Sequence, residues 1–235
     1  MSDSSLVDVV MLSPNRNSPR NHKIDTITIH CMAGNLTVET CGRLFQKESR
    51  HASSNYGIGT DGRIGLYVHE ADRAWTSGSP SNDHRAITIE VANDGGADTG
   101  WHVSDQAMAA LLDLLTDICK RNSIKKLLWK ADKSLIGKVE QQNMTVHRWF
   151  QNKACPGDYL YNKHGWIAEQ VNKRLEPLPD GKKYIPVLCN GTVVQCIGTL
   201  ENGITYIQLR NLAEPMGIAD VSWDPQRRLP IVTSK

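Results

Sequence analysis

A short segment rich in proline, glycine and charged residues separates two parts of the chain that differ in the length and order of their predicted strands and helices. It spans residues 176–183 and reads EPLPDGKK. Proline and glycine interrupt regular structure, so such a segment is typical of a domain boundary. With 235 residues, the chain is long enough for one full-sized domain and a small one. We therefore predict a first domain over residues 1–176, a linker over 177–184 and a small module over 185–235.

Predicted strands and helices alternate along the first domain. Residues 24–30 read IDTITIH, where β-branched side chains alternate with polar ones as a strand requires. Ser104 can cap a helix whose apolar side chains recur every three or four residues as far as Cys119. Further strands are expected at 56–59, 64–68, 87–92 and 145–150, and further helices at 37–46 and from 158 or 162 to 175. Such alternation predicts an α/β fold with a mixed sheet.

The part beyond the boundary has shorter elements. Strands are expected at 185–188, 192–197, 205–209 and 221–223, and a short helix near 212–216. This order predicts a small α+β module of its own.

Composition and charge exclude several classes of protein. The formal net charge of +2 gives no argument for a nucleic-acid partner, whereas a slightly basic surface suits an anionic cell wall. No stretch is apolar over the length needed to cross a bilayer, and the first residues lack the pattern of a signal peptide. We therefore expect synthesis in the cytoplasm without membrane insertion. The cysteines show no disulfide-framework spacing, although pairing of Cys31 with Cys41 stays open.

Three side chains form a candidate metal site. His30 ends the first predicted strand, His147 lies in TVHRWF, and Cys155 follows eight residues later in KACPGD. Two imidazoles and a thiolate suit zinc, and three protein ligands leave a fourth position open for water. Such a water can attack an amide carbonyl at neutral pH. Spacing alone does not decide the matter, because a strand-end histidine is more often structural and a lone cysteine is more often a small core residue.

The local sequences around these residues carry a family resemblance. In order, the segments are TIHCMAG, SSNYGIGTDGRIGLYVHE, RAITIEVAND and TVHRWFQNKACPGDYL. Together they resemble the type-2 N-acetylmuramoyl-L-alanine amidase family, which includes phage endolysins of the T7-lysozyme type and is related to peptidoglycan recognition proteins. The resemblance covers residues 22–175. It implies a central mixed β-sheet flanked by helices, with one Zn²⁺ held by His30, His147 and Cys155 in a groove that binds the cell wall.

The same resemblance implies catalytic roles for three more residues. Tyr56 matches the family's catalytic tyrosine, and Lys153 matches the lysine that faces the metal-bound water, where its charge can stabilise an oxyanion. Glu90 lies on a strand where family members often carry an acid, so it can serve as a general base. Alternation along that strand directs only one of its two residue sets away from the core, which leaves the placement of Glu90 open.

Two residues are candidates for substrate contact. Trp75 offers an aromatic face on which a sugar ring can pack. Many family members have a histidine directly after the Ala-Trp pair, whereas this chain has Thr76, so a contact assigned to that histidine is in doubt. His84 could line the groove instead, or it could be an ordinary loop residue. Trp101 and Trp149 can also line such a groove, with core or rim packing as the alternative.

The C-terminal module resembles the stalk-type domain named after the N-terminal domain of copper amine oxidases. The likeness rests on residues 202–206, 209–210, 213–217 and 221–224. It implies anchoring or spacing at the cell wall, with a passive spacer or a dimerisation element as the alternative. Nothing in the module suggests a copper site.

The resemblances together predict a zinc hydrolase that cleaves the amide bond between N-acetylmuramic acid and L-alanine. A phage or prophage endolysin, released through a holin or by lysis, fits a wall substrate and an appended module. The alternative is a recognition protein that binds muramoyl peptides without cutting them, but such relatives typically lose the cysteine ligand, which Cys155 retains. The sequence leaves the oligomeric state and the target bacterium open.

Overall fold

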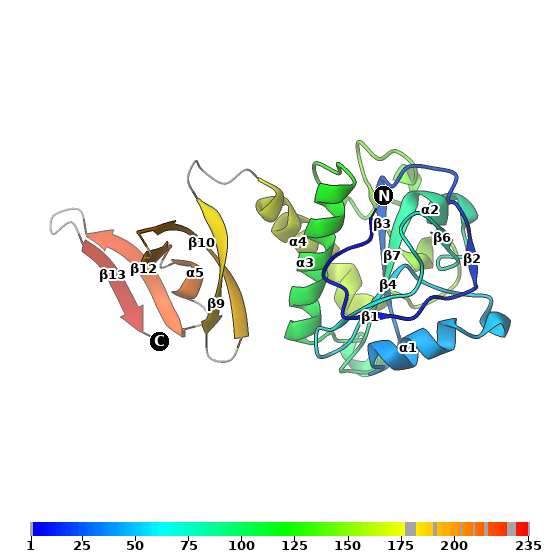
Figure 1. The fold of residues 1–235 in the computed structure, drawn as a ribbon, viewed down its shortest axis with the longest axis horizontal. Coiled ribbons are helices and arrows are strands. Elements are labelled where there is room, and N and C mark those ends of the chain that lie inside the picture. Colours follow the sequence, from blue (N-terminus) through cyan, green and yellow to red (C-terminus); the bar gives the residue numbers. More distant parts are fainter. Residues whose placement is uncertain are drawn as a thin grey trace. The chain divides into compact units, whose positions relative to one another are not determined.

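The computed structural model describes residues 2–176, 182–189, 192–202, 204–208, 210–213, 216–224 and 229–234. The chain forms two compact units, Met1–Glu176 and Pro177–Lys235 (Figure 1). None of the described helices has the length and apolarity needed to cross a membrane.

A six-stranded mixed sheet forms the centre of the first unit (Figure 1). Its strand order is β1-β5-β4-β7-β3-β8, in which β4, β7, β3 and β8 run parallel and β5 runs antiparallel to β4. This confirms the predicted central mixed sheet. The bounds are β1 (Val9–Val10), β3 (Thr26–Cys31), β4 (Tyr56–Ile58), β5 (Ile64–Leu66), β7 (Ala86–Val91) and β8 (Met144–Thr145).

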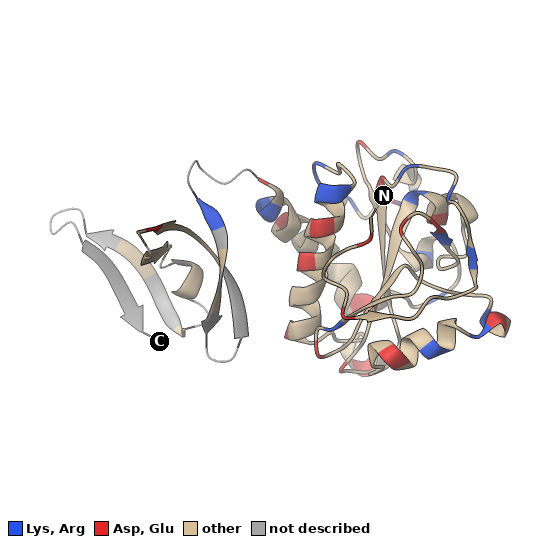
Figure 2. Ribbon diagram, viewed as in Figure 1, with Lys and Arg blue, Asp and Glu red and all other residues tan. Residues whose placement is uncertain are grey.

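Helices α3 (Asp105–Arg121) and α4 (Gly157–Leu175) cover one face of the sheet. Their apolar side chains share one buried core with every second residue of β3 and β7, from Ile27 and Ile87 onward. Ser104 caps α3 as predicted, because its Oγ accepts a hydrogen bond from the backbone N–H of Ala107. Helices α1 and α3 each carry an acid in the first turn and a base in the last, which complements the helix dipole (Figure 2).

The other face carries α1 (Val38–Phe45) and α2 (Pro80–Arg85). Asn82 of α2 donates to the Thr28 hydroxyl and accepts from the Thr145 hydroxyl, which ties the helix to the polar side of β3 and β8. Gly57 and Gly65 lie beneath the ring of Tyr67, where a Cβ atom would overlap the ring. Both faces are therefore buried, one by apolar and the other largely by polar contacts.

Short elements complete the first unit. The expected strand at 145–150 is wrong beyond Thr145, because the chain turns there into the 3-10 helix His147–Trp149. The remaining bounds are β2 (Arg16–Asn17), which pairs with β6 (Arg73–Ala74), and the 3-10 helices Glu48–Arg50, Ala97–Thr99 and Lys133–Leu135.

The second unit has two antiparallel sheets, ordered β11-β10-β9 and β12-β13. Of the predicted linker, residues 177–181 lie outside the described residues, and residues 183–184 already belong to β9. Residues 203, 209 and 214–215, which carry part of the stalk-domain resemblance, also lie outside them. The bounds are β9 (Lys183–Cys189), β10 (Thr192–Glu201), β11 (Ile204–Ile207), α5 (Arg210–Ala213), β12 (Ile218–Asp224) and β13 (Leu229–Ser234).

Candidate metal site

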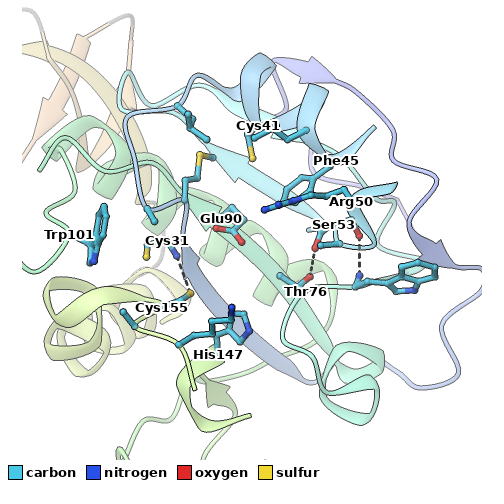
Figure 3. A pocket seen from close by; sticks show the side chains of 18 residues that line it. Cys31, Cys41, Phe45, Arg50, Ser53, Thr76, Glu90, Trp101, His147 and Cys155 are labelled. Atoms are coloured by element: carbon cyan, nitrogen blue, oxygen red, sulfur yellow. Dashed lines mark hydrogen bonds between the residues drawn. The ribbon is translucent and has the colours of Figure 1, made fainter. Parts of the chain in front are cut away.

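The three predicted metal ligands meet at one end of the sheet. His30, His147 and Cys155 each offer a ligand atom, and these atoms lie within 4.8 Å of one another. His30 is fully buried, whereas the other two are partly exposed. His147 and Cys155 lie side by side on the wall of a cavity (Figure 3).

Strand pairing brings the two histidines together. β3 and β8 run parallel with Thr28 opposite Thr145, so their carboxyl ends lie next to each other. The turn after Thr145 then places the His147 ring 5.0 Å from the His30 ring, between centroids. Two backbone contacts fix Cys155: its Sγ accepts from the N–H of Cys31 at 3.4 Å, and its carbonyl accepts from the N–H of Arg148 at 3.2 Å.

The donor set fits a zinc ion. Nδ1 of His30 lies 3.4 Å from Sγ of Cys155. Two ligands of tetrahedral zinc, one nitrogen and one sulfur, are about 3.5 Å apart for bond lengths of about 2.0 and 2.3 Å. Burial lowers the pKa of His30 well below its usual value, so the ring is neutral, as a ligand must be. Nε2 of His30 is buried without a hydrogen-bond partner.

The cysteines near this site form no disulfide bond. Cys31 and Cys41, whose pairing the sequence left open, are both free and buried. A side-chain hydrogen bond with Cys31 and burial raise the pKa of Cys155. A metal ion reverses this direction, because a coordinating thiol is deprotonated. The thiolate form of Cys155 would therefore depend on a bound cation.

Glu90 lies next to the metal ligands. The register of β3 and β7 sets Glu90 opposite His30, and its Oε1 is 4.0 Å from His30 Nδ1. Burial, followed by the nearby Cys31 thiol, raises its pKa well above the usual value, and its Oε2 is buried without a partner. Alternation thus directs Glu90 away from the α3 and α4 core and into the cavity (Figure 3).

Lys153 also lines this cavity, from the loop between His147 and Cys155. Its side chain is exposed, and its backbone N–H donates to the carbonyl of Gln151 at 2.9 Å. The structure thus brings Lys153 and Glu90 to the predicted metal site.

Tyr56 does not reach this site, which corrects the expectation of a catalytic role. Because it pairs with Ile89, its side chain lies on the face of the sheet opposite to Glu90. It is fully buried, and its hydroxyl donates to Oε1 of Glu70 at 2.6 Å and accepts from the N–H of Ser4 at 3.0 Å. Both hydrogen-bonding capacities of the hydroxyl are used for packing the N-terminal segment against this face.

The two predicted substrate contacts differ in position. Trp75 lines the cavity, and its indole N–H donates to Asn17 at 2.7 Å. His84 is not among the described residues that line the cavity or its extension. It lies in the last turn of α2, and its Nδ1 accepts from the N–H of Asn21 at 3.0 Å. The groove role expected for His84 therefore stays a prediction.

The cavity has two adjoining parts. One part, of about 340 Å³, has a mostly apolar wall that includes Leu36, Phe45 and Trp101. The other part, of about 400 Å³, shares Arg50, His147 and Lys153 with the first and adds Arg73 and Gln151. We call these the apolar arm and the basic arm.

Sequence reasoning missed most of the basic arm. Arg50, Arg73 and Gln151 come from a 3-10 helix, a short strand and a turn that have no periodicity and no motif of their own. Only the tertiary fold brings them beside His147. The one available signal was the position of Gln151 between His147 and Cys155.

Comparisons with known proteins agree with this geometry. The family model of N-acetylmuramoyl-L-alanine amidases matches residues 20–158, more than half of the chain. No curated protein matches. Among solved structures, AmpD is 17% identical with a TM-score of 0.52, covering 70% of this chain and 96% of that one. A mutant endolysin from Bacillus subtilis is 17% identical with a TM-score of 0.51, covering 70% and 99%.

A third solved structure, the hydrolase AmiA of Staphylococcus aureus, is 12% identical with a TM-score of 0.51, covering 73% of this chain and 85% of that one. At such identities these likenesses show the shared fold of the first unit.

Proposed function

The chain belongs to the N-acetylmuramoyl-L-alanine amidase family, and from that premise we propose that it hydrolyses the bond between N-acetylmuramic acid and L-alanine with one zinc ion. The observation that supports this most is the convergence of His30, His147 and Cys155 at a cavity that the last two of them line. When bound, zinc lowers the pKa of a water ligand and polarises the scissile carbonyl.

Glu90 and Lys153 have two further roles in this proposal, as general base and as the positive charge that stabilises the oxyanion. A carboxylate whose pKa is raised is suited to accept a proton near neutral pH, and no hydrogen bond occupies Oε2 of Glu90. Lys153 supplies a positive charge beside the carbonyl oxygen, where negative charge develops during attack. These roles require only that the scissile amide lie across the ligand cluster.

The two arms of the cavity suit the two parts of a muramoyl peptide. The guanidinium groups of Arg50 and Arg73 favour the carboxylates of an acidic stem peptide. The rings of Trp75 and Trp101 offer flat apolar surfaces for a sugar.

The experiment that tests this function is product analysis of purified peptidoglycan, digested with and without a zinc chelator. We expect new L-alanine amino termini to appear only in the presence of the metal. Binding to the wall without any release would instead identify a recognition protein. Release that resists complete chelation would contradict the zinc mechanism.

We further propose that the enzyme acts as a phage or prophage endolysin that reaches the wall after holin-type release or lysis. The second unit would then anchor or space the enzyme at the wall, in line with its stalk-domain resemblance. Support comes from the separate second unit and from a cavity that is open to solvent. Cleavage of soluble muramoyl peptides without any loss of turbidity of intact cell walls would contradict the endolysin role.

A further inference from the structure

The ring of His147 makes a hydrogen bond that neither the family match nor the proposed function assigns. Gln151 follows His147 by one turn, and its Oε1 lies 3.1 Å from Nε2 of the imidazole. The backbone supports this approach, because the N–H of Gln151 donates to the carbonyl of His147 at 3.1 Å. The partner of Nε2 is therefore a residue of the same loop.

A histidine that binds a metal through one ring nitrogen carries a proton on the other. The acceptor of that proton sets the tautomer and the orientation of the ring. We propose that Gln151 is a positioning residue: its Oε1 accepts the Nε2–H of His147 and leaves Nδ1 for the metal. This inference rests on the proposed zinc site.

The neighbouring loop leaves space for this glutamine. A Cβ atom on Gly78 would overlap the Gln151 amide, and Gly78 has a φ of 75°, which other residues rarely adopt. The loop is itself anchored, because Asp83 accepts from the N–H of Thr76 at 3.1 Å and from the hydroxyl of Ser77 at 2.6 Å. Gln151 therefore lies between a fixed loop and the ligand ring.

The test compares three variants of the full chain for zinc affinity, measured by competition with a chromophoric chelator. Gln151→Leu keeps a similar side-chain size but removes the acceptor. We expect zinc affinity to fall about tenfold, which is the low end for residues that hydrogen-bond to a metal ligand, because Gln151 is exposed. Gln151→Glu keeps an acceptor oxygen and should restore wild-type affinity or exceed it. Gln141→Leu, at an exposed glutamine outside the cavity, is the matched control and should change nothing.

A second measurement observes the His147 ring directly. Long-range ¹H–¹⁵N spectra of the zinc-loaded wild type should show a protonated Nε2 on His147, and Gln151→Leu should weaken or broaden that signal. Equal zinc affinity in Gln151→Leu and the wild type, or a deprotonated Nε2, would overturn the positioning role while leaving the zinc site intact. A wild type that binds no zinc at all would overturn the proposed function as well.

Discussion

The two faces of the central sheet are equally buried but chemically opposite. On β3 and β7, Ile29 and Ile89 pack against α3 and α4, whereas Glu90 lines the cavity and His30 lies buried beside it. The same strands thus supply core and active site by simple alternation. Because one face packs firmly, the other can hold polar groups at fixed positions.

Two carboxylates make the contrast concrete. Glu70 contacts the apolar-face residue Tyr56 and is saturated: Tyr56, Arg121 and Asn122 all donate to its oxygens, at distances from 2.6 to 3.1 Å. Glu90, on the cavity face, has an oxygen with no partner and a raised pKa. A satisfied buried charge is typical of structure, and an unsatisfied one is typical of a functional site.

Cys155→Ser, on the cavity face, should have the largest effect on activity. A serine hydroxyl is a poor zinc ligand beside two imidazoles, so we expect loss of zinc and of all amidase activity. Metal analysis after dialysis and the release of L-alanine amino termini measure the two effects. The exposed position of this loop means that the fold should survive, which circular dichroism would verify. Retained activity without bound metal would contradict the mechanism.

Glu90→Gln should have the next largest effect. The amide keeps the shape but cannot accept a proton, so we expect kcat to fall about 100- to 10,000-fold. Zinc content should stay at the wild-type level, which separates this variant from the ligand variant. The measurement is steady-state kinetics on a soluble muramoyl peptide. A kcat within a factor of two of wild type would remove Glu90 from the mechanism.

A third prediction concerns a titratable group buried on the α4 side. Burial lowers the pKa of His164 from 6.5 to about 4, and its ring lies 4.5 Å from that of Trp129. The folded state thus binds fewer protons than the unfolded state, so stability is complete above pH 6.5 and falls as the pH drops towards 4. The full loss corresponds to about 3 kcal/mol.

Urea unfolding of the metal-free protein across this pH range measures the loss. His164→Phe keeps an aromatic ring in this position and should flatten the dependence, because the titratable group is gone. An unchanged pH profile in that variant would assign the loss to other groups.

The sequence predicted local features of this fold well and non-local ones less well. The Ser104 cap depends on neighbours in the chain, and alternation in β3 is visible within seven residues, so both were accessible. The face on which Tyr56 lies depends on how β4 pairs with β7, which no local pattern encodes. The ligand cluster was found through its motif, whereas the contact of Gln151 with His147 required the turn that ends β8.

Tyr56→Phe sharpens the comparison because it removes one hydroxyl from the face that packs against α3 and α4 and changes nothing on the cavity face. The ring stays in the core, but Glu70 loses one of its donors, and a hydrogen bond to a charged group contributes about 1.5–3 kcal/mol. Arg121 and Asn122 still satisfy the carboxylate, so we expect a loss of about 1.5 kcal/mol in the free energy of unfolding, the lower end of that range. Urea titration measures it, and kcat should stay at the wild-type value because the hydroxyl faces away from the cavity. A collapse of kcat with unchanged stability would return Tyr56 to the catalytic site and show that the two faces communicate.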